Sequence, residues 1–214
     1  MLIGIPKEIK PDEYRVGLTP ESVLTLVNGG HQVMVLTNAG LGIGKGDQDY
    51  LKVGAEIVAT RDEIFERAEM VIKVKEPQLD ECALLRQGQI LFTYLHLAPD
   101  PEQTNALVNS GVSAIAYESV VAEDKSYPLL IPMSEIAGRM AVQAGASCLE
   151  KAKGGSGILM GGVTNVGPAK VTIIGGGVVG YNAIEIALGM QANVTVLDKS
   201  AARLDYLETV LATT

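Results

Sequence analysis

The chain has 214 residues, of which 47% are apolar and 20% charged, and its formal net charge is −8. This composition is typical of a globular protein with a buried core, and the acidic balance argues against a surface for nucleic acid or an anionic membrane. The N-terminus does not resemble a signal peptide, and polar residues and glycines interrupt the apolar region 171–192. Cys82 and Cys148 lie far apart without CxxC spacing, so we expect two reduced thiols in or near a core. These features together predict a cytoplasmic protein.

Short apolar runs alternate with helical patterns in the first part of the chain. Thr19-Pro20 and Asp100-Pro101 are typical helix starts, because Thr or Asp caps the helix and proline suits its first turn. The first of these helices is expected to end at Gly29-Gly30. The remaining expected elements are strands at 2–6, 31–37, 56–59, 70–75, 89–94 and 112–117 and helices at 47–53, 61–67, 80–86 and 101–109. Such alternation predicts βαβ units and a mainly parallel sheet.

The pattern divides the chain into three parts. An α/β domain is expected over residues 1–130, and residues 131–169 link it to a second domain. The linking part contains one long helix, 133–153, followed by a glycine-rich loop. The second domain starts at residue 170 with a strand, a glycine turn, a helix, a second strand and a third helix.

Gly175, Gly177 and Gly180 give the spacing GxGxxG between a β-branched strand and a helix. The spacing alone is a weak signal, but a second strand follows and ends in an acid, Asp198. The first glycine permits the sharp turn, the second lets a pyrophosphate approach the backbone, and the third lets helix and strand pack closely. The helix N-terminus offers free N–H groups and a positive dipole end to phosphates. The segment therefore predicts an NAD-binding turn, with a purely structural glycine turn as the alternative.

Asp198 is the candidate partner of the adenosine ribose hydroxyls. Its charge would repel a 2′-phosphate, which favours NAD over NADP. Lys199 and Arg203 lie close enough in sequence to weaken that preference. A role as N-cap of the helix beginning near Ser200 and Ala201 is the structural alternative.

A complete domain of this type has about six strands in two halves, whereas residues 170–214 supply only two. The sheet edge would stay open and the last helix would lack a packing partner. We therefore expect an α/β fold of two doubly wound Rossmann-like domains, the second truncated after its first βαβ unit, in an N-terminal fragment of a longer enzyme.

Three titratable side chains lie where strands of the first domain end, which is where α/β sheets bind ligands. Arg15 follows the first strand, and its guanidinium suits a carboxylate. Lys75 and Lys73 share a strand face, so periodicity does not choose between them, and position favours Lys75. His96 follows a later strand and is a candidate proton donor because it titrates near neutrality. Solvated or structural roles remain the alternatives for all three, and His31 is expected at the surface.

Several segments, in order along almost the whole chain, resemble the family of alanine dehydrogenases and nicotinamide nucleotide transhydrogenases. They are IGIPKEIKPDEYRVGLTP, VIKVKEP, LFTYLHLA, AIAYESV, PMSEIAGRMAVQAGA and VTIIGGGVVGYNA with VTVLD. The segment YLHLA resembles the amino-acid dehydrogenase branch, because the transhydrogenase branch passes hydride between two nucleotides and lacks a histidine of this role.

The resemblance implies NAD-dependent, reversible oxidative deamination of L-alanine to pyruvate and ammonia by a homohexamer without a metal. It implies that Arg15 and Lys75 hold the substrate carboxylate and carbonyl at the catalytic centre and that His96 is the acid/base group. Met133 and Ser134 are expected on the nicotinamide side. The residues expected on the rest of NAD are Gly175, Gly177, Val178, Val179, Gly180, Asp198 and Arg203.

The family has a second catalytic group, an aspartate, in the later part of the nucleotide domain, which lies beyond Thr214. We therefore expect the 214 residues alone to have little or no activity. An NAD(H)-binding component of a transhydrogenase is an alternative, against which Arg15 and His96 argue. A non-catalytic binding or assembly fragment is another, and saccharopine-type dehydrogenases share the architecture but act on a larger substrate.

Overall fold

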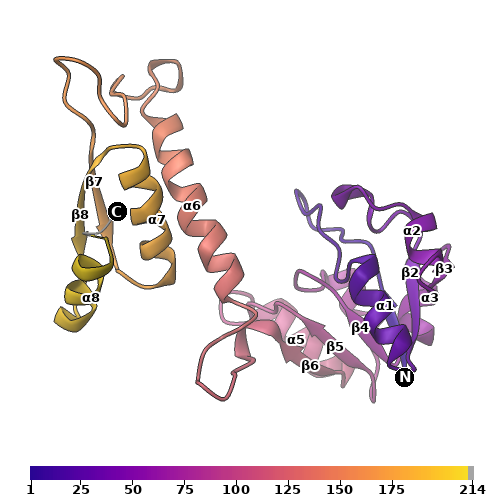
Figure 1. Cartoon of the computed structure of the whole chain (residues 1–214). Coiled ribbons are helices and arrows are strands. Elements are labelled where there is room, and N and C mark those ends of the chain that lie inside the picture. Colours follow the sequence, from indigo (N-terminus) through magenta and orange to yellow (C-terminus); the bar gives the residue numbers. More distant parts are fainter. Residues whose placement is uncertain (212–214) are drawn as a thin grey trace. The chain divides into compact units, whose positions relative to one another are not determined.

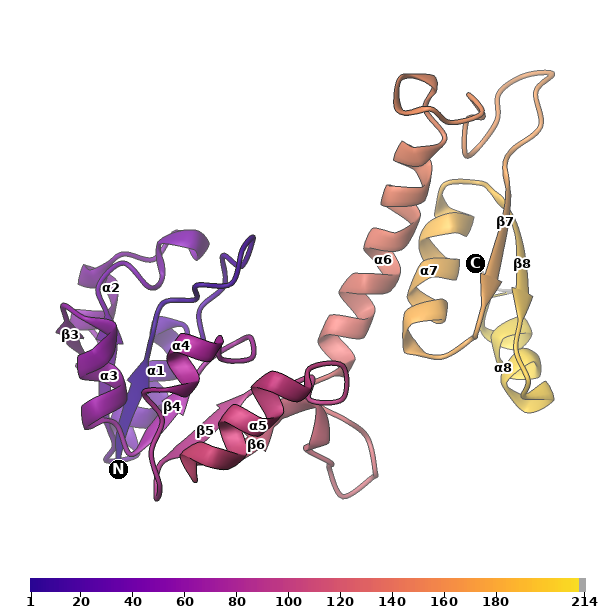
Figure 2. The same cartoon turned by 180° about the vertical axis from the view of Figure 1, so that it is seen from behind.

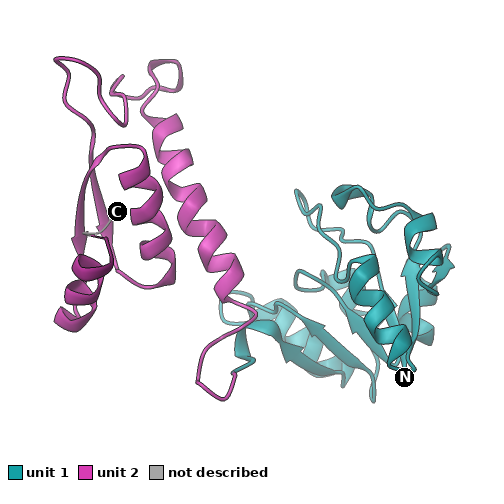
Figure 3. Ribbon diagram, in the orientation of Figure 1, with its two compact units in different colours: residues 1–121 teal, residues 122–214 magenta. Residues whose placement is uncertain are grey.

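The computed structural model describes residues 1–211, and the chain forms two compact units, Met1–Val121 and Ala122–Thr214 (Figure 3). The three-part division expected from the sequence stays a prediction. No helix within residues 1–211 combines the length and apolar character needed to cross a membrane.

Unit 1 contains a six-stranded parallel sheet in the order β3-β2-β1-β4-β5-β6. The strands are β1 Leu2–Ile5, β2 Gln32–Leu36, β3 Glu56–Val58, β4 Met70–Ile72, β5 Ile90–Thr93 and β6 Ser113–Ala116. The helices are α1 Pro20–Asn28, α2 Asp47–Leu51, α3 Arg61–Arg67, α4 Leu79–Cys82 and α5 Pro101–Ser110, with short 3-10 turns η1 Leu41–Ile43 and η2 Tyr117–Ser119. The winding direction reverses between β1 and β4, which confirms the predicted doubly wound α/β class.

Helices cover both faces of this sheet. Figure 1 shows α1 in front of it, and Figure 2, seen from behind, shows α3, α4 and α5 in front. Ile3 and Ile5 of β1 belong to the core on the α1 side. Gly4, between them, faces α3, because a Cβ there would lie 2.7 Å from Ile64 Cγ2 and 2.8 Å from Ala68 Cβ. The strand LIGI therefore carries a glycine where the α3 helix packs closely on the sheet.

The local signals for helix starts are confirmed. Thr19 Oγ1 accepts a hydrogen bond from the N–H of Ser22 at 3.4 Å, and Asp100 Oδ1 accepts one from Gln103 at 3.0 Å. Other predicted ends are wrong by a few residues. The helix expected at 80–86 is only Leu79–Cys82, and the strand expected at 70–75 is only Met70–Ile72.

Unit 2 contains the elements α6 Ile131–Cys148, η3 Lys151–Lys153, β7 Lys170–Ile174, α7 Val178–Gly189, β8 Asn193–Leu197 and α8 Ala201–Leu211. The β7 and β8 strands pair in parallel, and α7 lies between them and α6 (Figure 1). Gly138 of α6 permits close approach to α7, because a Cβ there would lie 2.3 Å from the Val179 carbonyl oxygen. Ile174 is 84% exposed, so the two-stranded sheet presents apolar side chains to solvent within the described residues.

The long helix expected at 133–153 ends at Cys148. The glycine loop causes this end: Gly155 donates to the Glu150 carbonyl oxygen at 2.9 Å, and Gly157 donates to that of Leu149 at 2.8 Å. Both cysteines are free thiols, as expected. Cys82 is buried, but Cys148 is exposed, so its expected place in or near a core is wrong.

Replacing Leu91 with alanine tests the packing of the central sheet. Leu91 of β5 is fully buried, so truncation is expected to lower the free energy of unfolding of unit 1 by about 2–5 kcal/mol. Val108→Ala is the control, because Val108 is 73% exposed and its loss should change stability by about 0.5 kcal/mol or less. Urea denaturation followed by circular dichroism measures both, and equal losses would contradict the assigned core.

Candidate functional site

The three candidate residues of unit 1 follow three adjacent strands, β1, β4 and β5. Because these strands are parallel, the segments containing Arg15, Lys75 and His96 all leave the same edge of the sheet. The reversal of winding between β1 and β4 lies among them, and this is where doubly wound sheets bind ligands. The fold therefore brings together the segments that sequence reasoning selected one by one.

Glu13 holds the guanidinium of Arg15. Arg15 Nε donates to Glu13 Oε1 at 2.8 Å and Nη2 donates to Oε2 at 2.6 Å, while the backbone N–H of Arg15 also reaches Oε1 at 2.9 Å. These hydrogen bonds, with the nearby charge of Lys75, lower the pKa of the Glu13 carboxyl. The Glu13 carboxylate thus interacts electrostatically with both Arg15 and Lys75. A small acid bound at this edge would meet the same two charges.

The structure separates the two lysines that periodicity left equivalent. The Lys73 side chain is fully buried, and its Nζ lies 2.8 Å from Glu81 Oε1 and 3.2 Å from Glu8 Oε2. Lys75 is partly exposed at 21%, with Nζ 3.5 Å from Glu76 Oε2. The ammonium of Lys73 is buried in ion pairs with Glu8 and Glu81, so Lys75 is the lysine that is able to reach a ligand.

Glu8 joins the loop after β1 to the chain leaving β4. Its Oε1 accepts the N–H of Val74 at 2.6 Å and lies 3.4 Å from that of Lys75. Beyond Ile72, where β4 ends, the chain still bonds β5 on its other side, because the N–H of Tyr94 donates to the Val74 carbonyl oxygen at 3.2 Å. Burial raises the pKa of the Glu8 carboxyl, against the opposing effect of the Lys73 charge. The backbone of Lys75 is therefore tied to the loop that leads to Arg15.

His96 is exposed and has a left-handed backbone, with φ of +48°. A non-glycine residue in this region costs of order 1–3 kcal/mol and persists only where surrounding contacts hold it. The N–H of His96 donates to Glu118 Oε1 at 2.8 Å, and its imidazole stacks on Tyr94 with ring centroids 6.3 Å apart. Tyr94 in turn meets Tyr117 edge-on at 4.9 Å. The His96 imidazole thus lies just after the carboxyl end of β5 and packs on Tyr94, which packs on Tyr117.

Four residues that contact the candidate residues were not predicted from the sequence: Glu8, Glu13, Glu118 and Tyr94. Glu13 carried a usable signal, because an acid two residues before a candidate arginine can pair with it. Glu8 and Glu118 carried none, since their partners lie 66 and 22 residues away in the sequence. His31 also differs from expectation: it is partly buried, and its Nδ1 has no hydrogen-bond partner.

The glycine turn of unit 2 has the shape that a pyrophosphate needs. Gly175 has φ of +96°, and a Cβ on Gly180 would lie 1.8 Å from the Gly175 carbonyl oxygen. A Cβ on Gly177, by contrast, would meet nothing within 4 Å, so the backbone there is open to a ligand. Val178 and Val179 form the exposed first turn of α7. These features fit a dinucleotide phosphate site at the helix N-terminus.

Asp198 closes this turn. Its Oδ2 accepts the N–H of Gly176 at 2.6 Å and its Oδ1 accepts that of Ser200 at 2.8 Å, and these bonds lower the pKa of the carboxyl. Ser200 Oγ accepts the N–H of Arg203 at 3.3 Å, so Ser200 and not Asp198 caps α8. Arg203 Nε donates to the Gly176 carbonyl oxygen, and its guanidinium lies 4.7 Å from the centre of the Tyr206 ring.

Met133 and Ser134 lie in the first turn of α6, and both are partly buried. The N–H of Ser134 donates to the Leu130 carbonyl oxygen at 3.0 Å. The α6 helix packs on α7, which follows the glycine turn, so both residues belong to the unit that carries this turn.

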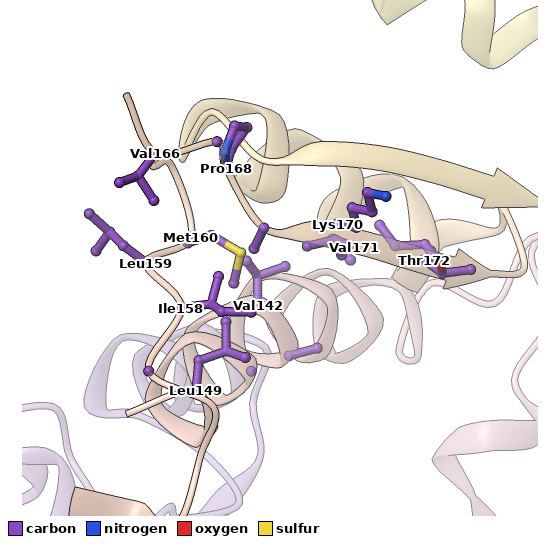
Figure 4. A pocket seen from close by; sticks show the side chains of 17 residues that line it. Val142, Leu149, Ile158, Leu159, Met160, Val166, Pro168, Lys170, Val171 and Thr172 are labelled. Atoms are coloured by element: carbon purple, nitrogen blue, oxygen red, sulfur yellow. The ribbon is translucent and has the colours of Figure 1, made fainter. Parts of the chain in front are cut away.

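An apolar groove of about 790 Å³ lies elsewhere in unit 2. Figure 4 shows Val142 of α6 and Leu149, just after that helix, lining it together with Met160 and with Val171 of β7. The glycine turn follows the carboxyl end of β7, whereas the groove is lined by the strand as far as Ile173. The groove contains no group suited to phosphate or acid/base chemistry apart from Lys170, so it is not part of the candidate site.

Two family models match the chain: "Alanine dehydrogenase/PNT, N-terminal domain" over residues 4–137 and "Alanine dehydrogenase/PNT, C-terminal domain" over residues 141–214. The chain belongs to the alanine dehydrogenase/PNT family. Alanine dehydrogenases of Methanococcus maripaludis and Bacillus subtilis are 56% and 55% identical to it, each over 98% of this chain. The chain spans only 56% and 55% of their respective lengths.

Solved structures agree with this assignment. An L-alanine dehydrogenase matches with a TM-score of 0.92 and 52% identity, over 100% of this chain and 59% of that protein. A transhydrogenase from Sinorhizobium meliloti matches with a TM-score of 0.80 and 27% identity, over 98% of this chain and 62% of that protein. Both solved structures share the fold of this chain, and the L-alanine dehydrogenase is more similar to it in sequence than the transhydrogenase.

The buried network around Lys73 can be tested by a stability measurement. Lys73→Met leaves Glu8 and Glu81 buried without their cation, so the free energy of unfolding should fall by about 3–5 kcal/mol. Lys52→Met is the control, because its pair with Asp49 is at the surface and contributes less than about 1 kcal/mol. Urea titration of the chain compares them. A loss at Lys73 no larger than that at Lys52 would rule out the assigned network.

Proposed function

We propose that this chain is the substrate-binding part and the start of the nucleotide-binding part of an NAD-dependent alanine dehydrogenase. The reaction is the reversible conversion of L-alanine, water and NAD⁺ to pyruvate, ammonium, NADH and a proton. The observation that carries the proposal is the placement of Arg15, Lys75 and His96 after three adjacent parallel strands. The identity of 55% to a curated alanine dehydrogenase supports it, against 27% to a transhydrogenase structure.

Three residues of unit 1 have different roles toward the substrate. The guanidinium of Arg15 binds the substrate carboxylate through two parallel hydrogen bonds, for which Glu13 now provides the acceptors. The ammonium of Lys75 donates to the carbonyl oxygen of pyruvate and stabilises negative charge on it. The imidazole of His96 takes a proton from the attacking water during deamination and returns one in the reverse direction.

The glycine turn of unit 2 holds the dinucleotide. Gly177 and the first turn of α7, with Val178 and Val179, face its pyrophosphate. Each oxygen of Asp198 accepts one backbone N–H and keeps a lone pair for a ribose hydroxyl. NAD, when bound, accepts or supplies the hydride at the substrate carbon. Ser134 and Met133 serve the nicotinamide side.

Asp198 favours NAD over NADP because its charge would repel a 2′-phosphate. Arg203 opposes this only weakly, since its guanidinium is already engaged by a backbone carbonyl and an aromatic ring. The homohexamer implied by the resemblance and the cytoplasmic location expected from the sequence remain part of the proposal. Little or no turnover is expected from the 214 residues alone.

The NAD site can be tested with two glycines of one helix. Gly180→Ala forces the turn to open, because its Cβ would lie 1.8 Å from the Gly175 carbonyl oxygen, and NAD affinity should fall at least about tenfold. Gly189→Ala is the matched control, since a Cβ there meets nothing within 4 Å. Calorimetric titration with NAD measures both variants. Equal affinities would remove the turn from the proposed site.

His96→Ala tests the acid/base assignment in an enzyme of full length. A chimaera in which the C-terminal part of the Bacillus subtilis relative completes these 214 residues provides it. Its kcat for alanine should fall about 10²- to 10⁴-fold on His96→Ala, because a positioned proton-transfer group contributes that much. His31→Ala is the control and should keep its kcat. NADH formation at 340 nm follows the reaction, and an unchanged kcat for His96→Ala would refute the assignment.

A further inference from the structure

The backbone that carries His96 is held by a carboxylate from the neighbouring strand's loop. Glu118 lies in η2, just after β6, and its Oε1 accepts the N–H groups of Leu95 at 3.0 Å and His96 at 2.8 Å. Its Oε2 lies 3.3 Å from the N–H of Leu95. Two consecutive backbone amides at the end of β5 therefore converge on one side chain.

These hydrogen bonds hold the unfavourable backbone conformation of His96. With φ of +48°, the residue sits where a side chain with a Cβ is disfavoured, so the surroundings must hold it there. On the carbonyl side, Gln103 Nε2 donates to the Leu95 carbonyl oxygen at 3.1 Å and Thr104 Oγ1 donates to that of Leu97 at 3.0 Å. The peptide N–H of His96 itself donates to the charged carboxylate of Glu118.

We propose that Glu118 is a positioning residue that fixes the left-handed backbone of His96 and thereby aims its imidazole at the substrate. The inference rests on the proposed function for its catalytic part. Glu8 gives an independent precedent at the same edge of the sheet. Its carboxylate, from the loop after β1, reaches the amides of Val74 and Lys75 after β4 in the same way.

The competing explanation is that Glu118 merely links two strand ends. A matched control exists in the same sheet. Asp47 Oδ1 accepts the N–H of Asn38 at 2.7 Å after β2, and Asn38 is also left-handed, with φ of +62°. Asp47 Oδ2 accepts the hydroxyl of Thr37 at 2.7 Å. The two carboxylates have similar local roles, but the Asp47 contact holds no candidate catalytic residue.

The first measurement needs no activity. The chain has two histidines, so carbon-13 labelling of histidine gives one set of imidazole signals for His96 and one for His31. Glu118→Ala should shift and average the His96 signals and leave those of His31 in place, whereas Asp47→Ala should leave both. Glu118→Gln should restore most of the native signal, because its carbonyl oxygen can accept both amides. Unchanged His96 signals in Glu118→Ala would overturn the inference.

The second measurement uses the full-length chimaera. Glu118→Ala should lower kcat for alanine about a hundredfold, the effect of misplacing a reacting group by about 1 Å, with the KM for NAD unchanged. In a His96→Ala background the same change should have no further effect. An equal fall in both backgrounds would show a purely structural role and overturn the inference. If Glu118→Ala does not fold, Glu118→Asp, which is too short to reach both amides, takes its place.

The two measurements keep the two proposals apart. Wild-type chimaera that does not turn over alanine would defeat the proposed function, and the imidazole signals would still decide whether Glu118 holds His96. A chimaera that is active, with a Glu118→Ala variant as fast as the wild type, would defeat the positioning role alone.

Discussion

The parallel pairing of β1 with β2 on one side and with β4 on the other is the constraint on which unit 1 depends. It sends the connections on either side of the reversal to opposite faces of the sheet, and doubly wound sheets bind ligands at the carboxyl edge of such a reversal. All six strands are parallel, so the loops that follow their carboxyl ends all leave from this edge. Arg15, Lys75 and His96 are useful together only because the strands that precede them are neighbours in the sheet and not in the sequence.

Strand ends at this edge leave backbone N–H groups without a ladder partner, and buried groups of this kind must be satisfied. Glu8 and Glu118 satisfy them from the loops of adjacent strands, at the residues that carry Lys75 and His96. The buried Lys73 forms ion pairs with both Glu8 and Glu81. The contacts of Glu8 and Glu118 therefore hold the backbone beside the groups proposed to bind and protonate the substrate.

Local chemistry explains what the sequence could predict. Apolar alternation located the strands, caps such as Thr19 and Asp100 located helix starts, and strand-end position selected Arg15, Lys75 and His96. Periodicity could not separate Lys73 from Lys75, because both lie on one strand face. It could not find Glu8 and Glu118, since their hydrogen bonds join segments far apart in the chain. Helix ends were also missed where a later loop folds back, as the glycine loop does after Cys148.

Unit 2 contributes the glycine turn, whose tight contact at Gly180 and open backbone at Gly177 fit a dinucleotide. The residues proposed to bind the substrate, however, all lie in unit 1 and can be tested there directly. Titration of the 214-residue chain with pyruvate, followed through the histidine imidazole signals, is the most direct measurement. Pyruvate held by Arg15 at its carboxylate and by Lys75 at its carbonyl oxygen should shift the His96 signals in a saturable way and leave those of His31 unchanged. No shift at His96, or equal shifts at both histidines, would contradict a substrate site at this edge of the sheet.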